Sequence, residues 1–295
     1  MIPHLLTVMA LWAILAVSLN LVVGLTGLFN LGHAAFFGIG AYASALLAQA
    51  GLPYPVCLAA AVALPALAGI GVGLPTLRLR GDYLAMATLG FGEISRAVFR
   101  NWVGLTRGPM GLPGIPRPEL LGLRIDSPAK WVATAFVGLA LAWLVAELVT
   151  RAPLGRMLRA IREDELAVQA LGKNPEPYKL LALALGAGLA GFGGSLYAHY
   201  VAFVDPTPFA LPTTIFLFLL IVLGGLGNHG GSILAAFVLL ALRESLRFTG
   251  LPPSIAAPLQ QLVFSILLVT LVIYRPWGLL PEPRLRSLRD RAARA

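Results

Sequence analysis

The chain has 295 residues, of which 58% are hydrophobic and only 12% are charged. Soluble domains usually carry about a quarter charged residues, so this composition excludes an ordinary soluble protein and indicates an integral membrane protein. The formal net charge of +9 is explained better by anionic lipid headgroups than by nucleic acid, because most of it lies in the polar segments and the tail. Cys57 is the one cysteine, so we expect no disulfide framework, no metal site and no cofactor.

Windows of about 20 apolar residues predict an all-α, polytopic transmembrane helical bundle with about eight or nine spans. The first apolar run lacks a basic flank and is too long for a signal peptide, so we interpret it as a retained span. The run GGLGNHGG at 224–231 separates two of the spans and could equally mark a re-entrant turn. The nine candidate spans are residues 5–25, 33–49, 56–75, 83–103, 131–149, 178–200, 211–227, 231–248 and 255–274.

A cluster of charge at residues 150–179 interrupts the apolar chain. It holds six of the 22 Lys/Arg residues and four of the 13 Asp/Glu residues. Such a cluster cannot lie unpaired in hydrocarbon, so it must face water at one membrane surface. Placing the cluster, the loop 76–82 and the tail 275–295 on one side gathers 14 of the 22 basic residues there. The positive-inside rule then predicts that the cluster and the C-terminus are cytoplasmic.

The charged cluster has the pattern of two short helices that lie against the membrane. Pro153 suits a first helical turn, and Gly172 suits a helix stop. Two apolar stripes flank a polar stretch, which we interpret as a surface offered to a partner. A solvated loop helix with ordinary charge pairs would show the same pattern, because amphipathicity alone does not separate the two. The polar stretch consists of Arg162, Glu163, Asp164 and Glu165.

Several polar residues lie inside the predicted spans. Asn20, Asn30 and His33 flank the glycine-broken run 24–32, where a helix end could present free amide groups to a substrate carboxylate. The same glycines could instead allow close helix packing. Glu93 and Arg96 share one helical face and either hold the bundle together as an ion pair or serve substrate passage. The candidate pathway residues are Asn20, Asn30, His33, Glu93, Arg96 and His199.

Four stretches resemble a known family. GRMLRAIREDELAVQALGKN (155–174) resembles the cytoplasmic coupling segment of ATP-binding-cassette (ABC) importer permeases. The stretches 19–48, 81–102 and 193–209 are similar to branched-chain amino-acid (LIV-type) permeases, and the second of them resembles the M-type subunit. The four occur in this order over most of residues 19–232.

The resemblance implies an importer core in a bacterial inner membrane. This chain would pair with a homologous H-type permease, two cytoplasmic ATPases and an extracytoplasmic binding protein. Residues 1–275 would form the permease domain, with a coupling segment at about 151–174, and 276–295 would form a basic cytoplasmic tail. The resemblance adds Ala167 and Gly172 to the polar stretch as residues that couple to the ATPase.

The sequence is compatible with ATP hydrolysis on a separate subunit. A Walker A loop needs a lysine followed by Ser or Thr, whereas Lys130, Lys173 and Lys179 are followed by Trp, Asn and Leu. We therefore expect no enzymatic activity in this chain and an ATPase on another polypeptide. The alternatives are an ion-coupled secondary transporter of a small polar solute and a permease of the same family for urea or amides. The Gly- and Pro-rich segment 106–124 could meet a binding protein or simply connect two spans.

Overall fold

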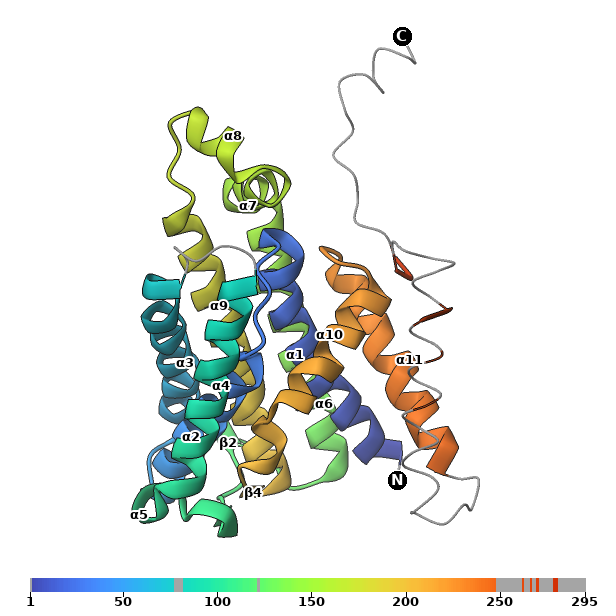
Figure 1. The fold of residues 1–295 in the computed structure, drawn as a ribbon. Coiled ribbons are helices and arrows are strands. Elements are labelled where there is room, and N and C mark those ends of the chain that lie inside the picture. Colours follow the sequence, from blue (N-terminus) through green and yellow to red (C-terminus); the bar gives the residue numbers. More distant parts are fainter. Residues whose placement is uncertain are drawn as a thin grey trace.

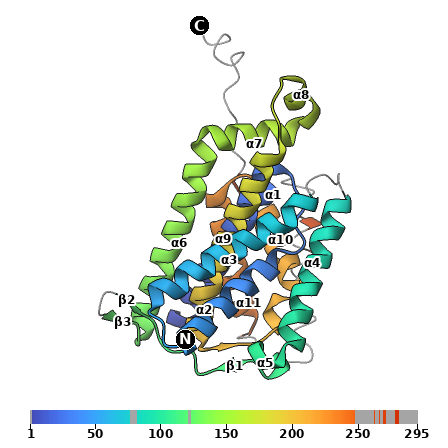
Figure 2. The same ribbon diagram turned by 90° about the vertical axis from the view of Figure 1, so that its left-hand side faces the viewer.

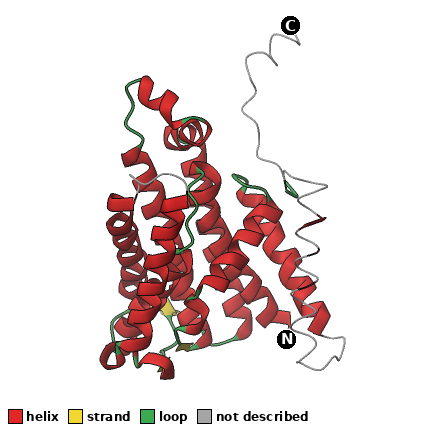
Figure 3. Ribbon diagram, viewed as in Figure 1, coloured by secondary structure: helices red, strands yellow, loops and turns green. Residues whose placement is uncertain are grey.

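The computed structural model describes residues 2–76, 82–120 and 123–247, with isolated positions at 262, 266, 269, 270 and 278–280. The regular secondary structure of the described part is helical except for four two-residue strands, and loops connect these elements (Figure 3). The helices are α1 (Ile2–Thr26), α2 (His33–Gln49), α3 (Tyr54–Thr76), α4 (Asp82–Asn101), α5 (Val103–Thr106), α6 (Pro128–Arg151), α7 (Pro153–Glu163), α8 (Glu165–Ala170), α9 (Glu176–Val201), α10 (Leu211–Gly224) and α11 (His229–Arg247). The short elements are β1 (Leu112–Pro113), β2 (Glu119–Leu120), β3 (Leu123–Arg124), β4 (Phe203–Val204) and the 3-10 helices η1 (Gly108–Met110) and η2 (Thr207–Phe209).

The bundle has two distinct ends (Figure 1). The α8 end carries α7 and α8, the C-terminus of α1 and the turn between α10 and α11, whereas the loop end carries the N-terminus, α5 and the strands. The apolar helix α1 runs through the middle, where it packs against α6, α9, α10 and α11 and is buried over most of its length. Burying the first helix on several sides makes it the scaffold on which the other helices assemble.

Within the described ranges, four helices are long and apolar enough to cross a membrane, namely α1, α3, α6 and α9. The pair α10 and α11 gives a fifth candidate if it counts as one span, although the two helices are bent by 116° at their junction. The predicted count of eight or nine spans is therefore not confirmed. The helix α2 has only 17 residues, and α4 carries Glu93, Arg96 and Arg100. The ninth predicted span, 255–274, lies outside the described residues apart from isolated positions.

The predicted break in the glycine-rich run is confirmed, since α1 ends at Thr26 and α2 begins at His33. The connecting residues turn back into the bundle, where the Leu31 amide donates to Thr88 Oγ1 at 3.0 Å. A Cβ at Gly32 would lie 2.2 Å from the Thr88 carbonyl oxygen. Only glycine allows this approach of α4 to the start of α2.

Close backbone contact also fixes α9 between α1, α2 and α3. Added Cβ atoms at Gly191 and Gly194 would lie 2.0 Å from the Ala61 carbonyl oxygen and 2.3 Å from that of Phe37. A Cβ at Gly186 would lie 2.2 Å from the Val22 side chain and 3.0 Å from the Ser18 carbonyl oxygen of α1. Small residues permit such contacts between membrane helices, so the helices around α9 form a tightly packed unit.

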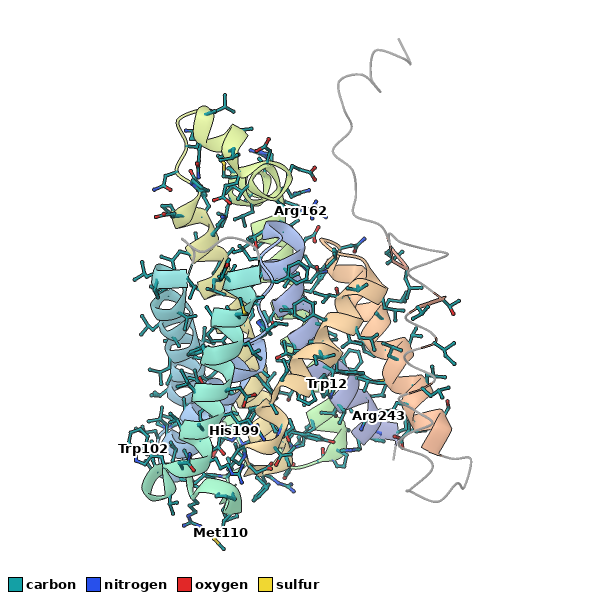
Figure 4. All side chains as sticks on the ribbon, in the orientation of Figure 1. Trp12, Trp102, Met110, Arg162, His199 and Arg243 are labelled. Atoms are coloured by element: carbon teal, nitrogen blue, oxygen red, sulfur yellow. The ribbon has the colours of Figure 1, made fainter. Side chains whose placement is uncertain are left out.

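The loop end is tied down by hydrogen bonds. Strand β1 pairs antiparallel with β4, so the segment after α5 is fastened to the end of α9. Gln49 donates to the Pro113 carbonyl at 2.8 Å. Lys130 donates to Asp126 at 2.8 Å at the start of α6, and this hydrogen bond and charge hold the pKa of Asp126 below its usual value. Met110 and Trp102 project outward at this end (Figure 4).

Candidate functional site

The predicted coupling segment, about 151–174, forms two helices at one end of the molecule. Helix α7 lies across the end of α6 (Figure 2), and α8 stands clear of the bundle. The predicted start at Pro153 and stop at Gly172 are both confirmed, the latter by a left-handed φ of 75°. On α8 and just after it, Leu166 and Leu171 are 61% and 81% exposed. The segment therefore presents an apolar tip that the chain itself does not cover.

Arg162 turns toward the bundle and not toward the tip (Figure 4). Its guanidinium donates to the Gly24 carbonyl, and its aliphatic stem lies near Gly27. The last carbonyls of a helix lack partners within the helix, so Arg162 caps the C-terminus of α1 with a favourable positive charge. It fastens α7 to α1.

Two acidic residues of the polar stretch also have internal partners. Asp164 Oδ1 accepts a hydrogen bond from the Ala167 amide at 2.9 Å and so caps α8. Glu165 pairs with Lys179 at 2.6 Å. By contrast, the Glu163 carboxylate lies on the surface, 3.6 Å from Arg162. Ala167 and Gly172 are exposed as well. Of the six predicted coupling residues, Glu163, Asp164, Ala167 and Gly172 are thus exposed, whereas Arg162 and Glu165 are half-buried.

A cleft of about 440 Å³ separates the coupling segment from the bundle. Its lining includes Thr26, Phe29, Leu84 and Lys179 from the bundle side and Arg162 and Glu163 from the predicted coupling segment. Its walls combine apolar side chains with both signs of charge. The cleft lets α8 stand away from the membrane helices while α7 remains attached to them.

Residues 1–272 match the family model described as branched-chain amino acid transport system / permease component. The chain belongs to this family. It is 39% identical to the high-affinity branched-chain amino acid transport system permease protein LivM of Escherichia coli K12, over 94% of this chain and 69% of that protein. The probable LivM of Methanocaldococcus jannaschii is 27% identical over 92% of this chain and 91% of its own length.

The permease protein LivH of Salmonella typhimurium LT2 is 24% identical over 94% of this chain and 93% of its own. No solved structure matches the chain. As a permease component of an ABC system, the protein is a non-catalytic transport subunit of the membrane. The described residues hold no group of three His, Cys, Asp or Glu side chains that could bind a metal ion.

In this permease the Glu93–Arg96 pair lies on the outside of the single chain. The two side chains are 3.2 Å apart, and that of Arg96 is 38% exposed and that of Glu93 50%. Next to Glu93 is a small cavity of about 10 Å³, bounded by Gly32 on the break before α2 and by Leu211 and Thr214 of α10. The cavity has the volume of roughly one water molecule, so it is too small for an amino acid.

The permease residues around the first helix break contact each other. His33 Nε2 lies 2.8 Å from Ser18 Oγ, and the Asn30 amide nitrogen lies 3.5 Å from His33 Nδ1. Ser18 Oγ donates to the Leu15 carbonyl, so the histidine supplies the Nε2–H proton. The amides at the break also have partners, since Gly32 N donates to Asn30 and Ala34 N to Thr214. This helix end is satisfied internally.

His199 and Asn20 are buried at opposite ends of the permease. His199 Nδ1 lies 2.8 Å from the Pro116 carbonyl, and its Nε2 lies 3.0 Å from Ser44 Oγ, so it fastens the loop-end segment to α9 and α2. Asn20 contacts the α10–α11 turn instead. No short-range sequence pattern marks the partners of Asn20, the Lys179–Glu165 pair or the contact of Thr150 with His229, so these contacts are visible only in the structure.

Proposed function

We propose that this chain is one of two permease subunits of an ABC importer for branched-chain amino acids and that an ATPase subunit docks on α8. The exposed apolar tip of Leu166 and Leu171 carries this proposal, because large apolar side chains that project into water are typical of partner contacts. Glu163, Ala167 and Gly172 form the remainder of the docking surface. Arg162, Asp164 and Glu165 hold that surface in place through their internal bonds.

We infer that the α8 end and the C-terminus are cytoplasmic and that the chain lies in a bacterial inner membrane. The bias of basic residues supports this orientation. The amides of Leu279 and Leu280 donate to the carbonyls of Leu223 and Gly224 at the α8 end, which fits a basic tail 276–295 on that side. The proposed permease domain, 1–275, has eight or nine membrane segments when the short α2, the polar α4, the α10–α11 pair (as one or two segments) and the predicted span 255–274 are added to the four long apolar helices.

The proposed pathway runs along the exposed face of α4 and is completed by an H-type permease. A charged pair is costly against lipid, so Glu93 and Arg96 favour a facing subunit or water over hydrocarbon. The similarity to LivH supports a pair of homologous permeases with related folds. The buried Asn20, Asn30, His33 and His199 would then shape the walls of this pathway and not contact substrate directly.

The loop end is the proposed contact for an extracytoplasmic binding protein, since its strands hold the segment around Met110 outward. The names of the LivM relatives support leucine, isoleucine and valine as cargo. A permease of the same family for urea or amides remains the alternative. Uptake of each candidate by the complex assembled with its own binding protein distinguishes them.

Docking is tested with the purified complex in proteoliposomes. Leu166→Ser with Leu171→Ser is expected to release the ATPase subunits and to abolish ATP-driven uptake, because the apolar contact is lost. The control is Leu148→Ser, which changes an equally exposed leucine on α6 away from the tip. Co-purification of the ATPase measures the result, and normal binding by the double variant would contradict the proposal.

A further inference from the structure

The turn between α10 and α11 lies at the α8 end, beside the coupling segment (Figure 1). Gly224 and Gly231 meet back to back, since a Cβ on Gly224 would lie 2.5 Å from the Gly231 carbonyl carbon. The two helices bend by 116° around residues 225–228. This hairpin thus has a compact turn that other elements can hold as a unit.

One set of contacts joins this turn to α7 through the end of α1. Arg162 of α7 donates to the Gly24 carbonyl. A Cβ on Gly24 would lie only 2.5 Å from the Gly227 amide nitrogen, so this part of α1 touches the turn directly. One helical turn earlier, Asn20 Oδ1 accepts from the Gly227 amide at 2.9 Å.

The Asn20 amide group clasps the turn from the other side. Its nitrogen lies 3.0 Å from the Asn228 carbonyl and 2.7 Å from Ser232 Oγ, with the Gly225 carbonyl at 3.2 Å. A buried amide satisfied on both its oxygen and its nitrogen is costly to separate from its partners. The turn should therefore move together with the C-terminal part of α1, which Arg162 attaches to α7.

A second set of contacts reaches the same turn through the end of α6. Arg159 of α7 donates to the Thr150 carbonyl at 2.7 Å. The Thr150 hydroxyl donates to the Ala146 carbonyl at 2.7 Å and lies 2.8 Å from His229 Nε2. His229 is the first residue of α11, and its Nε2–H is consequently the donor to Thr150. Both routes start on α7 and end on residues 225–232.

The opposite end of α10 lies at the proposed pathway. Thr214 Oγ1 accepts from the Ala34 amide at 3.1 Å, and Leu211 and Thr214 border the small cavity beside Glu93. Helix α10 thus extends from the turn held by α7 to the residues that would have to part for an amino acid to pass.

We propose that the α10–α11 hairpin is the gate that the coupling segment moves, and that Asn20, Thr150 and His229 are the positioning residues that join its turn to α7. The inference rests on the proposed function, because it requires ATP-driven motion of α7. A displacement of α7 carries the turn with it and shifts the far end of α10 against α2 and α4. Both bonded routes are needed to tie the turn to α7, so the hairpin moves with α7 as a lever.

Thr150→Val tests the route through α6, because valine keeps the shape and removes the hydroxyl. In the reconstituted complex we expect uptake per ATP hydrolysed to fall about fivefold while ATP hydrolysis continues. Thr150→Ser restores the hydroxyl and should restore the ratio. The matched control is Ser44→Ala, which breaks the buried bonds to Ser195 and His199 at the loop end and should leave the ratio unchanged. An unchanged ratio in Thr150→Val, or an equal fall in Ser44→Ala, would overturn the proposal.

A distance measurement tests the motion without disturbing the contacts. In a Cys57→Ala background, nitroxide labels are placed at Ala160 on α7, at Leu226 in the turn and at Leu52 at the loop end. Between the nucleotide-free and ATP-trapped complexes, the 160–226 distance should stay constant and the 52–226 distance should change. Equal changes in both would overturn the lever. Absence of ATP-driven uptake in the unmodified complex would instead refute the proposed function.

Discussion

Lys179 illustrates how one residue's environment sets its role. It lies in the first turn of α9, where the helix dipole disfavours a positive charge, and its side chain is only 6% exposed. The Glu165 carboxylate at 2.6 Å offsets both costs. The pair therefore fixes the position of the coupling segment relative to α9, and it also neutralises the buried charge of Lys179.

Glu165→Gln should therefore lower the free energy of unfolding by about 1–2 kcal/mol, because it leaves a buried ammonium group with a weaker partner. Glu163→Gln is the matched change on an exposed carboxylate and should shift stability by less than about 0.5 kcal/mol. Thermal unfolding of the purified protein in detergent measures both. Equal shifts would show that the Lys179 pair contributes nothing beyond surface charge.

At the scale of elements, the elbow between α6 and α7 is built for close contact. Arg159 caps the Thr150 carbonyl, and Gly155 packs on the same carbonyl. Helix α7 is consequently fixed in direction relative to α6, which lets a short helix transmit displacement to a long one. The close contact at this elbow depends on the absence of a side chain at Gly155 more than on the identity of the neighbouring side chains.

Gly155→Ala should destabilise the protein by about 1–3 kcal/mol, because its Cβ would lie 2.3 Å from the Thr150 carbonyl oxygen. Gly71→Ala in α3 is the control, since an added Cβ there has nothing within 4 Å. That change should stabilise the helix by about 0.5–1 kcal/mol. Opposite signs in a chemical unfolding assay would support the elbow, and a tolerated Gly155→Ala would contradict it.

At the scale of the whole molecule, different elements gather at the two ends of the bundle. The α8 end gathers the coupling segment and the hairpin turn, whereas the loop end gathers the strands and η1. The helices that join the two ends are the elements that can transmit a structural change from one end to the other. Under the proposed function, substrate delivery and ATP use would take place on these separate surfaces.

Single cysteines placed in a Cys57→Ala background test this division. Leu171→Cys at the α8 end and Met110→Cys at the loop end are both highly exposed. A membrane-impermeant maleimide should label Met110→Cys in spheroplasts, and Leu171→Cys only in inverted vesicles from cells that lack the ATPase subunits. Labelling of both positions from one side would refute the proposed orientation.

The sequence predicted local features better than distant ones. Gly172 ended the coupling segment as expected, and the glycine run broke the chain between α1 and α2, because turn chemistry is a local property. The inward direction of Arg162 could not be foreseen, since its partner is a carbonyl 138 residues earlier. Hydrophobic periodicity in the sequence indicates which face of a helix is polar, but it does not indicate which other helix that face contacts. The span count is not confirmed for a similar reason, as packing allows α2 and α4 to be short or charged.

The clasp made by Asn20 has a consequence for biosynthesis. Its partner Gly227 follows 207 residues later in the chain, so at roughly 5–20 residues per second the ribosome needs about 10–40 s to supply it. During that time the first helix waits in or beside the membrane with a polar group that lipid cannot satisfy. The nascent chain must keep Asn20 near water or the insertion machinery until the hairpin emerges, so the gate is completed among the last steps of assembly.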